Sequence, residues 1–199
     1  MNISTLVARE KSDYVPIPEG QHRAVCSAIV SLGNQESFGS VRHQMVMGLE
    51  FPDVRIERDE DGQKIDEPRM KWTFYTVSLH NKANLRKDLE SWRGRGFTKE
   101  ELEGFDVMSV LGHACLVTII HDHSGEKVKD KITSFGKIHG DGEIPKPELP
   151  LISYTEENNE HWDLLPEWIR EKIRSQIVVE APIVQETESE DPDDADIPF

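Results

Sequence analysis

Five strand-like segments, several with apolar and polar residues in alternation, are interrupted once by a helical period, and this pattern most constrains the fold of the chain. The segments span residues 21–32, 41–51, 69–79, 114–122 and 127–138. A period of two is typical of strands that bury one face. Between the third and fourth segments, Leu85, Leu89 and Trp92 recur at helical spacing, and Gly94 ends that pattern. We therefore expect the order strand, strand, strand, helix, strand, strand.

The alternation also predicts which residues share a face. In the first strand one buried face is expected to hold Ala24, Cys26, Ala28, Val30 and Leu32. Residues 52–68 are polar and rich in turn formers, which predicts a long hairpin loop. Thr98 and Glu101 form a capping-box pattern at the start of a short second helix.

This order predicts a mainly β chain. Five strands with a helix between the third and fourth are typical of the OB-fold, a partly open Greek-key barrel that binds oligonucleotides. Another small antiparallel α+β domain is the alternative. We expect a lead-in at 1–19, the barrel at 20–140, a linker and a C-terminal helix packed on the barrel at 141–179, and a disordered acidic tail at 180–199.

Charge is distributed unevenly along the chain. The sequence has 23 Lys and Arg against 38 Asp and Glu, a formal net charge of −15. Residues 180–199 contain eight acids and no base, whereas residues 69–99 contain eight bases and two acids. Because phosphates repel acidic surfaces, the bulk charge alone argues against nucleic-acid binding. The separation of charge leaves the basic middle as a candidate for it.

The basic middle also carries aromatic residues, and cations interleaved with rings are what a non-specific single-strand binder needs. On the third strand, either Lys71 and Tyr75 or Trp72 and Phe74 face the groove, and the other set faces the core. A lysine row on the last strand, expected on one face with Phe135, contacts phosphates or protects an edge strand. The predicted single-stranded DNA contacts are Lys71, Trp72, Tyr75, Arg86, Lys87, Arg93, Arg95, Lys127, Lys129, Lys131 and Phe135.

The tail ESEDPDDADIPF ends in an apolar triplet after a run of acids. An apolar anchor of this kind suits docking into a pocket on a basic partner. The ending resembles the acidic tip of bacterial single-stranded DNA-binding proteins, which closes in Asp-Asp-Asp-Ile-Pro-Phe; Ala195 departs from that pattern. The matching residues are Asp193, Asp194, Asp196, Ile197, Pro198 and Phe199. The resemblance implies recruitment of replication, repair or recombination proteins, and a tail that can fold back onto the DNA groove.

A second resemblance covers most of residues 15–178. The stretches PIPEGQHRAVCSAIVSLG and KWTFYTVSLHNKANLRKDLESWRGRGFTKEELEGFDVMSVLGHACLVTIIH resemble a family of bacteriophage proteins from replication or recombination modules. That resemblance implies a phage single-stranded DNA-binding protein, which acts in the infected bacterial cytoplasm. A homo-oligomer is compatible with it.

Several other functions find little support. The chain has no GxxxxGK[ST], GxSxG or HExxH motif, and His121 with His123 supplies only two of the three or four ligands that a zinc site needs. We therefore expect no enzyme activity, no metal and no cofactor. Two cysteines, no signal-peptide pattern and no membrane-spanning run predict a cytosolic protein. The alternative function is an acidic DNA mimic that occupies the DNA site of a host enzyme; a metal-dependent nuclease ranks below it.

Overall fold

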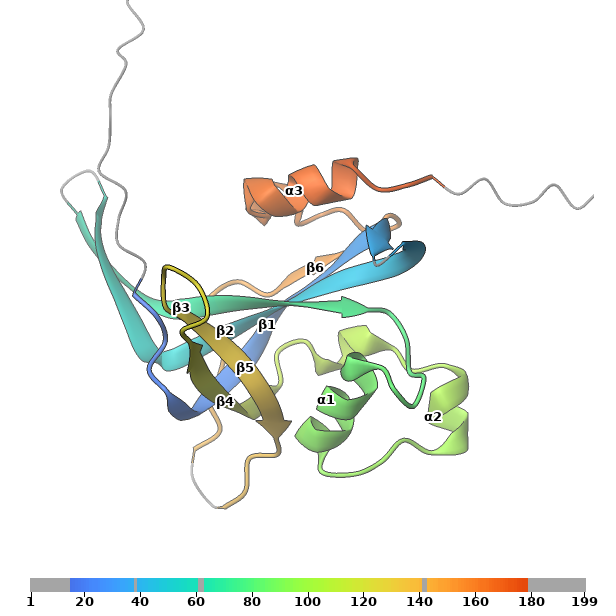
Figure 1. The fold of residues 1–199 in the computed structure, drawn as a ribbon. Helices are drawn as coiled ribbons and strands as arrows, with labels where there is room; N and C mark the ends of the chain where they lie inside the picture. Colours follow the sequence, from blue (N-terminus) through green and yellow to red (C-terminus); the bar gives the residue numbers. More distant parts are fainter. Residues whose placement is uncertain (1–14, 38, 61–62, 141–142, 179–199) are drawn as a thin grey trace, which may run out of the picture.

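A computed structural model describes residues 15–37, 39–60, 63–140 and 143–178 (Figure 1). The strands are β1 (Gly20–Ser37), β2 (Ser40–Glu60), β3 (Gln63–Thr76), β4 (Ala114–Asp122), β5 (Lys129–Gly136) and β6 (Ile152–Tyr154). The helices are α1 (Asn84–Arg93), α2 (Lys99–Glu103) and α3 (Glu167–Arg174), with short 3-10 turns η1 (Val107–Val110) and η2 (Trp162–Leu164).

One sheet organises the described residues. Its strand order is β3-β2-β1-β4-β5, with antiparallel neighbours, and β6 adds a parallel pairing to Ala28–Val30 of β1. The prediction of a mainly β chain with a helix between the third and fourth strands is confirmed. Within the described residues the sheet is not closed, because no ladder joins its two edge strands, β3 and β5. The sixth strand, β6, lies in the segment that was expected to be a linker.

Two β-bulges in β1 divide its apolar residues between two cores. The register shifts between Cys26 and Ala28 and again between Ser31 and Gly33. An extra residue reverses the alternation of faces, so the expectation of one shared face was wrong. Ala24, Cys26 and Ile29 lie in the main core, beneath α1, β4 and β5. The outer core lies on the opposite face and contains Val30, Leu32, Val46, Tyr154, Leu165, Ile169 and Ile173.

The predicted hairpin loop at residues 52–68 is instead a long two-stranded ribbon. After an irregularity between Phe51 and Arg55, β2 and β3 pair from Arg55↔Pro68 to Glu60↔Gln63. The Nε of Arg55 donates to Asp66 at 2.8 Å across the ribbon. This ribbon extends beyond the core, so cross-strand polar pairs replace the apolar alternation by which strands are recognised in a sequence.

Helix α1 fills the space between the diverging edges of β3 and β5. Its buried residues are Leu85, Leu89 and Trp92, as the helical spacing predicts. It begins at Asn84 and is capped by Gly94, whose φ of 68° is left-handed, as the sequence predicts. The capping box of Thr98 and Glu101 is formed at α2.

Helix α3 covers the other side of the sheet. Figure 1 shows α3 on one side of β1–β3 and α1 with α2 on the opposite side. Ile169 and Ile173 of α3 pack into the outer core. The chain reaches α3 through a strap at residues 143–151, which the buried carboxylate of Glu50 holds by accepting from the Glu148 and Leu149 N–H groups at 2.7 and 3.2 Å. Within the described ranges no helix has both the length and the apolar character needed to cross a membrane.

Candidate nucleic-acid interface

Strand β3 places its aromatic residues on opposite faces. Tyr75 is only 5% exposed, and its hydroxyl donates to Oδ2 of Asp88 on α1 at 2.8 Å. Burial raises the pKa of Asp88, although the Tyr75 hydroxyl and Lys87 favour its charged form. Phe74 points outward and is 47% exposed. The ring of Tyr75 is part of the main core and offers no free face in this structure, and its predicted stacking on bases stays a prediction.

On the outer face of the sheet, the rings of Trp72 and Phe74 gather around Trp168. The ring centroids of Trp168, on α3, lie 5.8 Å from those of both Trp72 and Phe74. Trp168 is 37% exposed, and Nζ of Lys172 lies 5.6 Å from the Phe74 centroid. Trp72 is half-buried against the outer core. We call Trp72, Phe74 and Trp168 the aromatic patch; it combines accessible ring faces with a cation.

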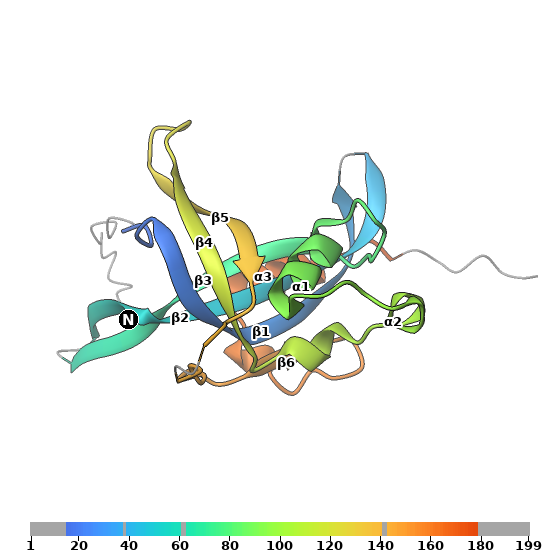
Figure 2. The same cartoon turned by 90° about the horizontal axis from the view of Figure 1, so that it is seen from below.

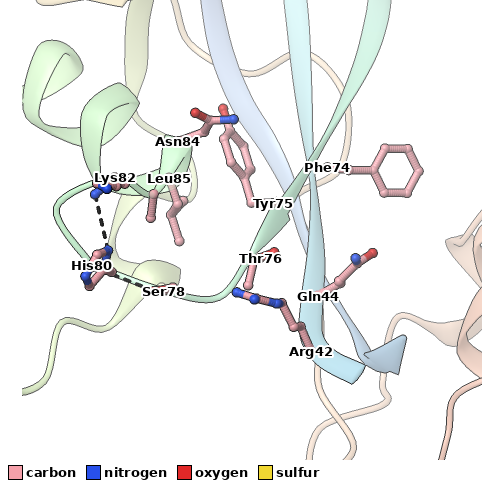
Figure 3. Close-up of a pocket in the computed structure, with 11 residues that line it drawn as sticks. Arg42, Gln44, Phe74, Tyr75, Thr76, Ser78, His80, Lys82, Asn84 and Leu85 are labelled. Atoms are coloured by element: carbon pink, nitrogen blue, oxygen red, sulfur yellow. Dashed lines mark hydrogen bonds between the residues drawn. The ribbon is translucent and has the colours of Figure 1, made fainter. Parts of the chain in front are cut away.

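A cleft of about 480 Å³ adjoins the patch where β2 begins and β3 ends. Figure 3 shows its walls, with Arg42 and Gln44 from β2, Phe74 and Tyr75 from β3, and Lys82 from the following loop. We call it the β3 cleft. The residues lining it include no carboxylate, although the chain as a whole is strongly acidic. Its charged lining residues, Arg42 and Lys82, suit an anion such as a phosphodiester, whereas the adjoining cavity is lined by the carboxylate of Asp88.

A smaller cavity of about 260 Å³ extends the β3 cleft toward β5. It shares Phe74, Tyr75 and Asn84 with the β3 cleft and adds Thr133 and Phe135 of β5. We call it the seam cavity, because it lies between the two open edges of the sheet. Together the two form a groove along the edge of β3.

Lys71 contributes to the fold at this seam. Its ammonium donates to the backbone carbonyl of Asp130 at 2.8 Å and lies 3.2 Å from the Asp130 carboxylate. Burial, and secondarily the charge of Arg69, lowers the pKa of Lys71, and burial raises that of Asp130. The predicted DNA-contacting lysine therefore links β3 to β5 and is mostly enclosed.

Three of the predicted cations on and after α1 have partners within the chain. Arg86 donates to Glu90 at 2.9 Å. Arg93 is paired with Glu101, and Arg95 donates to the same carboxylate at 2.8 Å. The two pairs with Glu101 hold α2 against the end of α1, whereas the Arg86–Glu90 pair lies within α1. Lys87 is exposed, and its predicted contact with phosphate stays a prediction.

The β5 lysines and Phe135 do not share a face. Lys127, Lys129 and Lys131 are exposed, whereas Phe135 is 7% exposed and stacks on Trp92 with centroids 6.1 Å apart. The register shifts at this point, because Thr118 pairs with Ser134 while Ile119 pairs with Ile132. This irregularity turns Phe135 away from the lysine row and toward Trp92, so that little of its ring is exposed at the seam cavity. The lysines line neither the β3 cleft nor the seam cavity, and their contact with phosphates stays a prediction.

Sequence reasoning missed the residues that shape the groove. Arg42, Lys82, Lys172 and Trp168 were not among the predicted contacts. Phe74 belonged to one of the two ring sets left open on the third strand. A polar residue at every second position of β2 was the available signal for Arg42 and Gln44, whereas only the tertiary position of α3 brings Trp168 and Lys172 to β3.

The remaining predictions from the sequence concern the acidic tail, His121 and a metal site. The tail residues from Asp193 to Phe199 lie outside the described residues. His121 has a role in the fold, since its Nε2 lies 2.8 Å from the Ile17 carbonyl oxygen. Among the described residues, no group of three or more His, Cys, Asp or Glu side chains is arranged to hold a metal ion.

No protein-family model matches the chain, and no curated protein shows significant similarity to it. Its function is therefore inferred from the groove and from the sequence.

Proposed function

We propose that this protein binds single-stranded DNA without sequence specificity. The observation that carries the proposal is the exposed aromatic patch beside a carboxylate-free, cationic cleft on an otherwise acidic chain. Single-strand binders use cations that follow the backbone and aromatic faces on which any base can stack. Phe74 and Trp168 supply the faces, and Arg42, Lys82 and Lys172 supply the cations.

We also propose that the domain is an OB-fold. The strand order and the position of α1 between β3 and β4 support this assignment. In a closed barrel β3 would pair with β5, and here Lys71 links those two strands through Asp130. The groove along the β3 edge then lies at the opening of the barrel.

In the proposed mechanism the single-stranded DNA lies along the edge of β3. Bases stack on Phe74 and Trp168, and the flanking phosphates contact Arg42, Lys82 and Lys172. A duplex keeps its bases stacked on one another, so it offers these rings no free base face. The rings therefore favour single strands, and the cations make binding weaker as salt rises.

We propose that the acidic tail recruits partner proteins. Its resemblance to the tip of bacterial single-stranded DNA-binding proteins supports this role for Asp193, Asp194, Asp196, Ile197, Pro198 and Phe199. The second resemblance supports a place in a phage replication or recombination system. Removing residues 186–199 should raise DNA affinity at low salt if the tail competes for the groove, and unchanged affinity would exclude that competition.

Tryptophan fluorescence tests the central proposal, because Trp72 and Trp168 lie in the patch. The protein is titrated with oligo-dT and with a matched duplex, at low and at high salt. We expect strong quenching by oligo-dT, a weak response to duplex, and loss of affinity with salt. No response to oligo-dT, in both the full chain and a version ending at Gln185, would overturn the proposal and favour the acidic DNA mimic.

A further inference from the structure

A second cleft lies on the opposite face of β2 from the β3 cleft and is also lined by β1. It also measures about 480 Å³. Successive side chains of a strand point to opposite faces, so Arg42 and Gln44 line the β3 cleft while His43 and Met45 line this one. The two clefts therefore lie on opposite faces of β2. The charged side chains of one are cationic and those of the other are acidic.

This second cleft has an apolar floor and an acidic rim. Ile29, Met45 and Val77 contribute to the floor. The carboxylates of Glu156 and Glu157 stand on the rim with Asp106, and the described lining residues include no Lys or Arg. We call it the acidic cleft. A surface that fits this cleft would present an apolar side chain flanked by cations.

The outward face of the β4–β5 hairpin has that chemistry. Ile120 is 42% exposed and lies opposite Lys131 in the antiparallel register. Lys129 and Lys127 are exposed further toward the tip. None of these lysines lines the groove proposed for DNA. The hairpin therefore presents one apolar residue beside three cations and one carboxylate, Asp122, which lies opposite Lys129. The mechanism proposed for DNA does not use this surface.

The hairpin and the acidic cleft lie near opposite ends of β1. Ile119 pairs with Gly20 at the start of the strand, whereas the acidic cleft includes Ile29 and Asn34 further along it. Figure 2 shows the β4–β5 and β1–β2 hairpins extending from different sides of the molecule. From Gly20 to Asn34 an extended strand covers up to about 46 Å. The cleft is therefore better placed to receive the hairpin of another copy than its own.

We propose that the β4–β5 hairpin of one copy docks into the acidic cleft of a second copy. Ile120 contacts the apolar floor, and Lys129 and Lys131 face Glu156 and Glu157. Because the two surfaces differ, the contact is head-to-tail, and it extends into an open row unless the rotation between copies closes a ring. In combination with the proposed DNA binding, such a row places successive β3 clefts along one strand; the self-association itself does not depend on DNA.

Charge reversal tests the contact without DNA. Sedimentation velocity over a concentration series, at low and high salt, is run on the wild type, on Lys129→Glu/Lys131→Glu and on Glu156→Lys/Glu157→Lys. We expect concentration-dependent association of the wild type that weakens with salt, and at least about tenfold weaker association of each variant. An equimolar mixture of the two variants should associate again, because each then meets a surface of opposite charge. Lys146→Glu and Glu57→Lys are exposed charge controls, and circular dichroism verifies folding of every variant.

The outcomes separate this proposal from the proposed function. A wild type that stays monomeric at every concentration, or a mixture that fails to associate, would overturn the docking. Binding of a short oligo-dT, which holds one copy, should be unchanged in Glu156→Lys/Glu157→Lys. If Lys129→Glu/Lys131→Glu loses affinity for that oligonucleotide yet self-associates normally, the lysines contact phosphates and the docking proposal fails.

Discussion

Replacing Phe74 by Ala should weaken single-stranded DNA binding and leave the fold intact. The ring stands on the outward face of β3, outside the main core that holds Tyr75. In the proposed complex a base covers the ring face that solvent covers in the free protein. Losing the ring removes that contact and the contact with Trp168, whereas the packing of the main core depends on other residues.

The size of the effect follows from the exposed area. Phe74 is 47% exposed, and a phenylalanine side chain buries about 200 Å² when fully enclosed. A base that covers the exposed half therefore removes about 90 Å² from water, worth about 2 kcal/mol at about 25 cal/mol per Å². This agrees with about 1–3 kcal/mol for one stacked base and corresponds to about thirtyfold in Kd.

The assay is fluorescence anisotropy of labelled oligo-dT at fixed salt, with the wild type and Phe74→Ala measured side by side. Ile144→Ala is the matched control, because Ile144 is also an exposed large apolar residue but lines neither part of the groove. A urea melt of each variant verifies that stability is retained. Kd for Phe74→Ala within twofold of the wild type would refute the stacking role, provided that the wild type binds.

Three further predictions follow from the structure. Tyr75→Phe removes the hydroxyl that donates to Asp88 and should cost about 1–3 kcal/mol of unfolding free energy in urea, with little change in DNA affinity; equal stability would contradict it. Burial raises the pKa of Glu50 above its usual 4.5, so its contribution to stability is fully present below that value and is lost as pH rises through the raised pKa. The Tm of the wild type should therefore rise relative to that of Glu50→Gln as the pH falls. A Tm difference that does not change with pH would exclude this contribution of Glu50 to stability. Gly48→Ala places a Cβ 2.8 Å from Trp72 and 2.9 Å from Ala28; it should destabilise the fold by about 1–3 kcal/mol in urea and disturb the aromatic patch, and an unchanged urea midpoint would argue against it.

Local patterns determined much of the architecture. The period of two located the strands, the spacing of Leu85, Leu89 and Trp92 located α1, and Thr98 with Glu101 located the start of α2. These features depend on residues close in the sequence, and the physical causes act over a few positions. The polar ribbon of β2 and β3 was missed because its cross-strand partners are polar and do not alternate with a buried face.

Tertiary structure decided which side chains are available for binding. The sequence left two ring sets open on the third strand, and packing under α1 buried Tyr75 while Phe74 stayed outside. Bulges and register shifts, which no local period reveals, turned Phe135 inward and divided the apolar residues of β1 between two cores. Acidic partners that approach from other elements engaged Lys71 and Arg93. Local patterns therefore determined the position of most elements. Long-range packing decided which residues share a covered face and which remain in the groove, because bulges and partners from distant elements leave no local period.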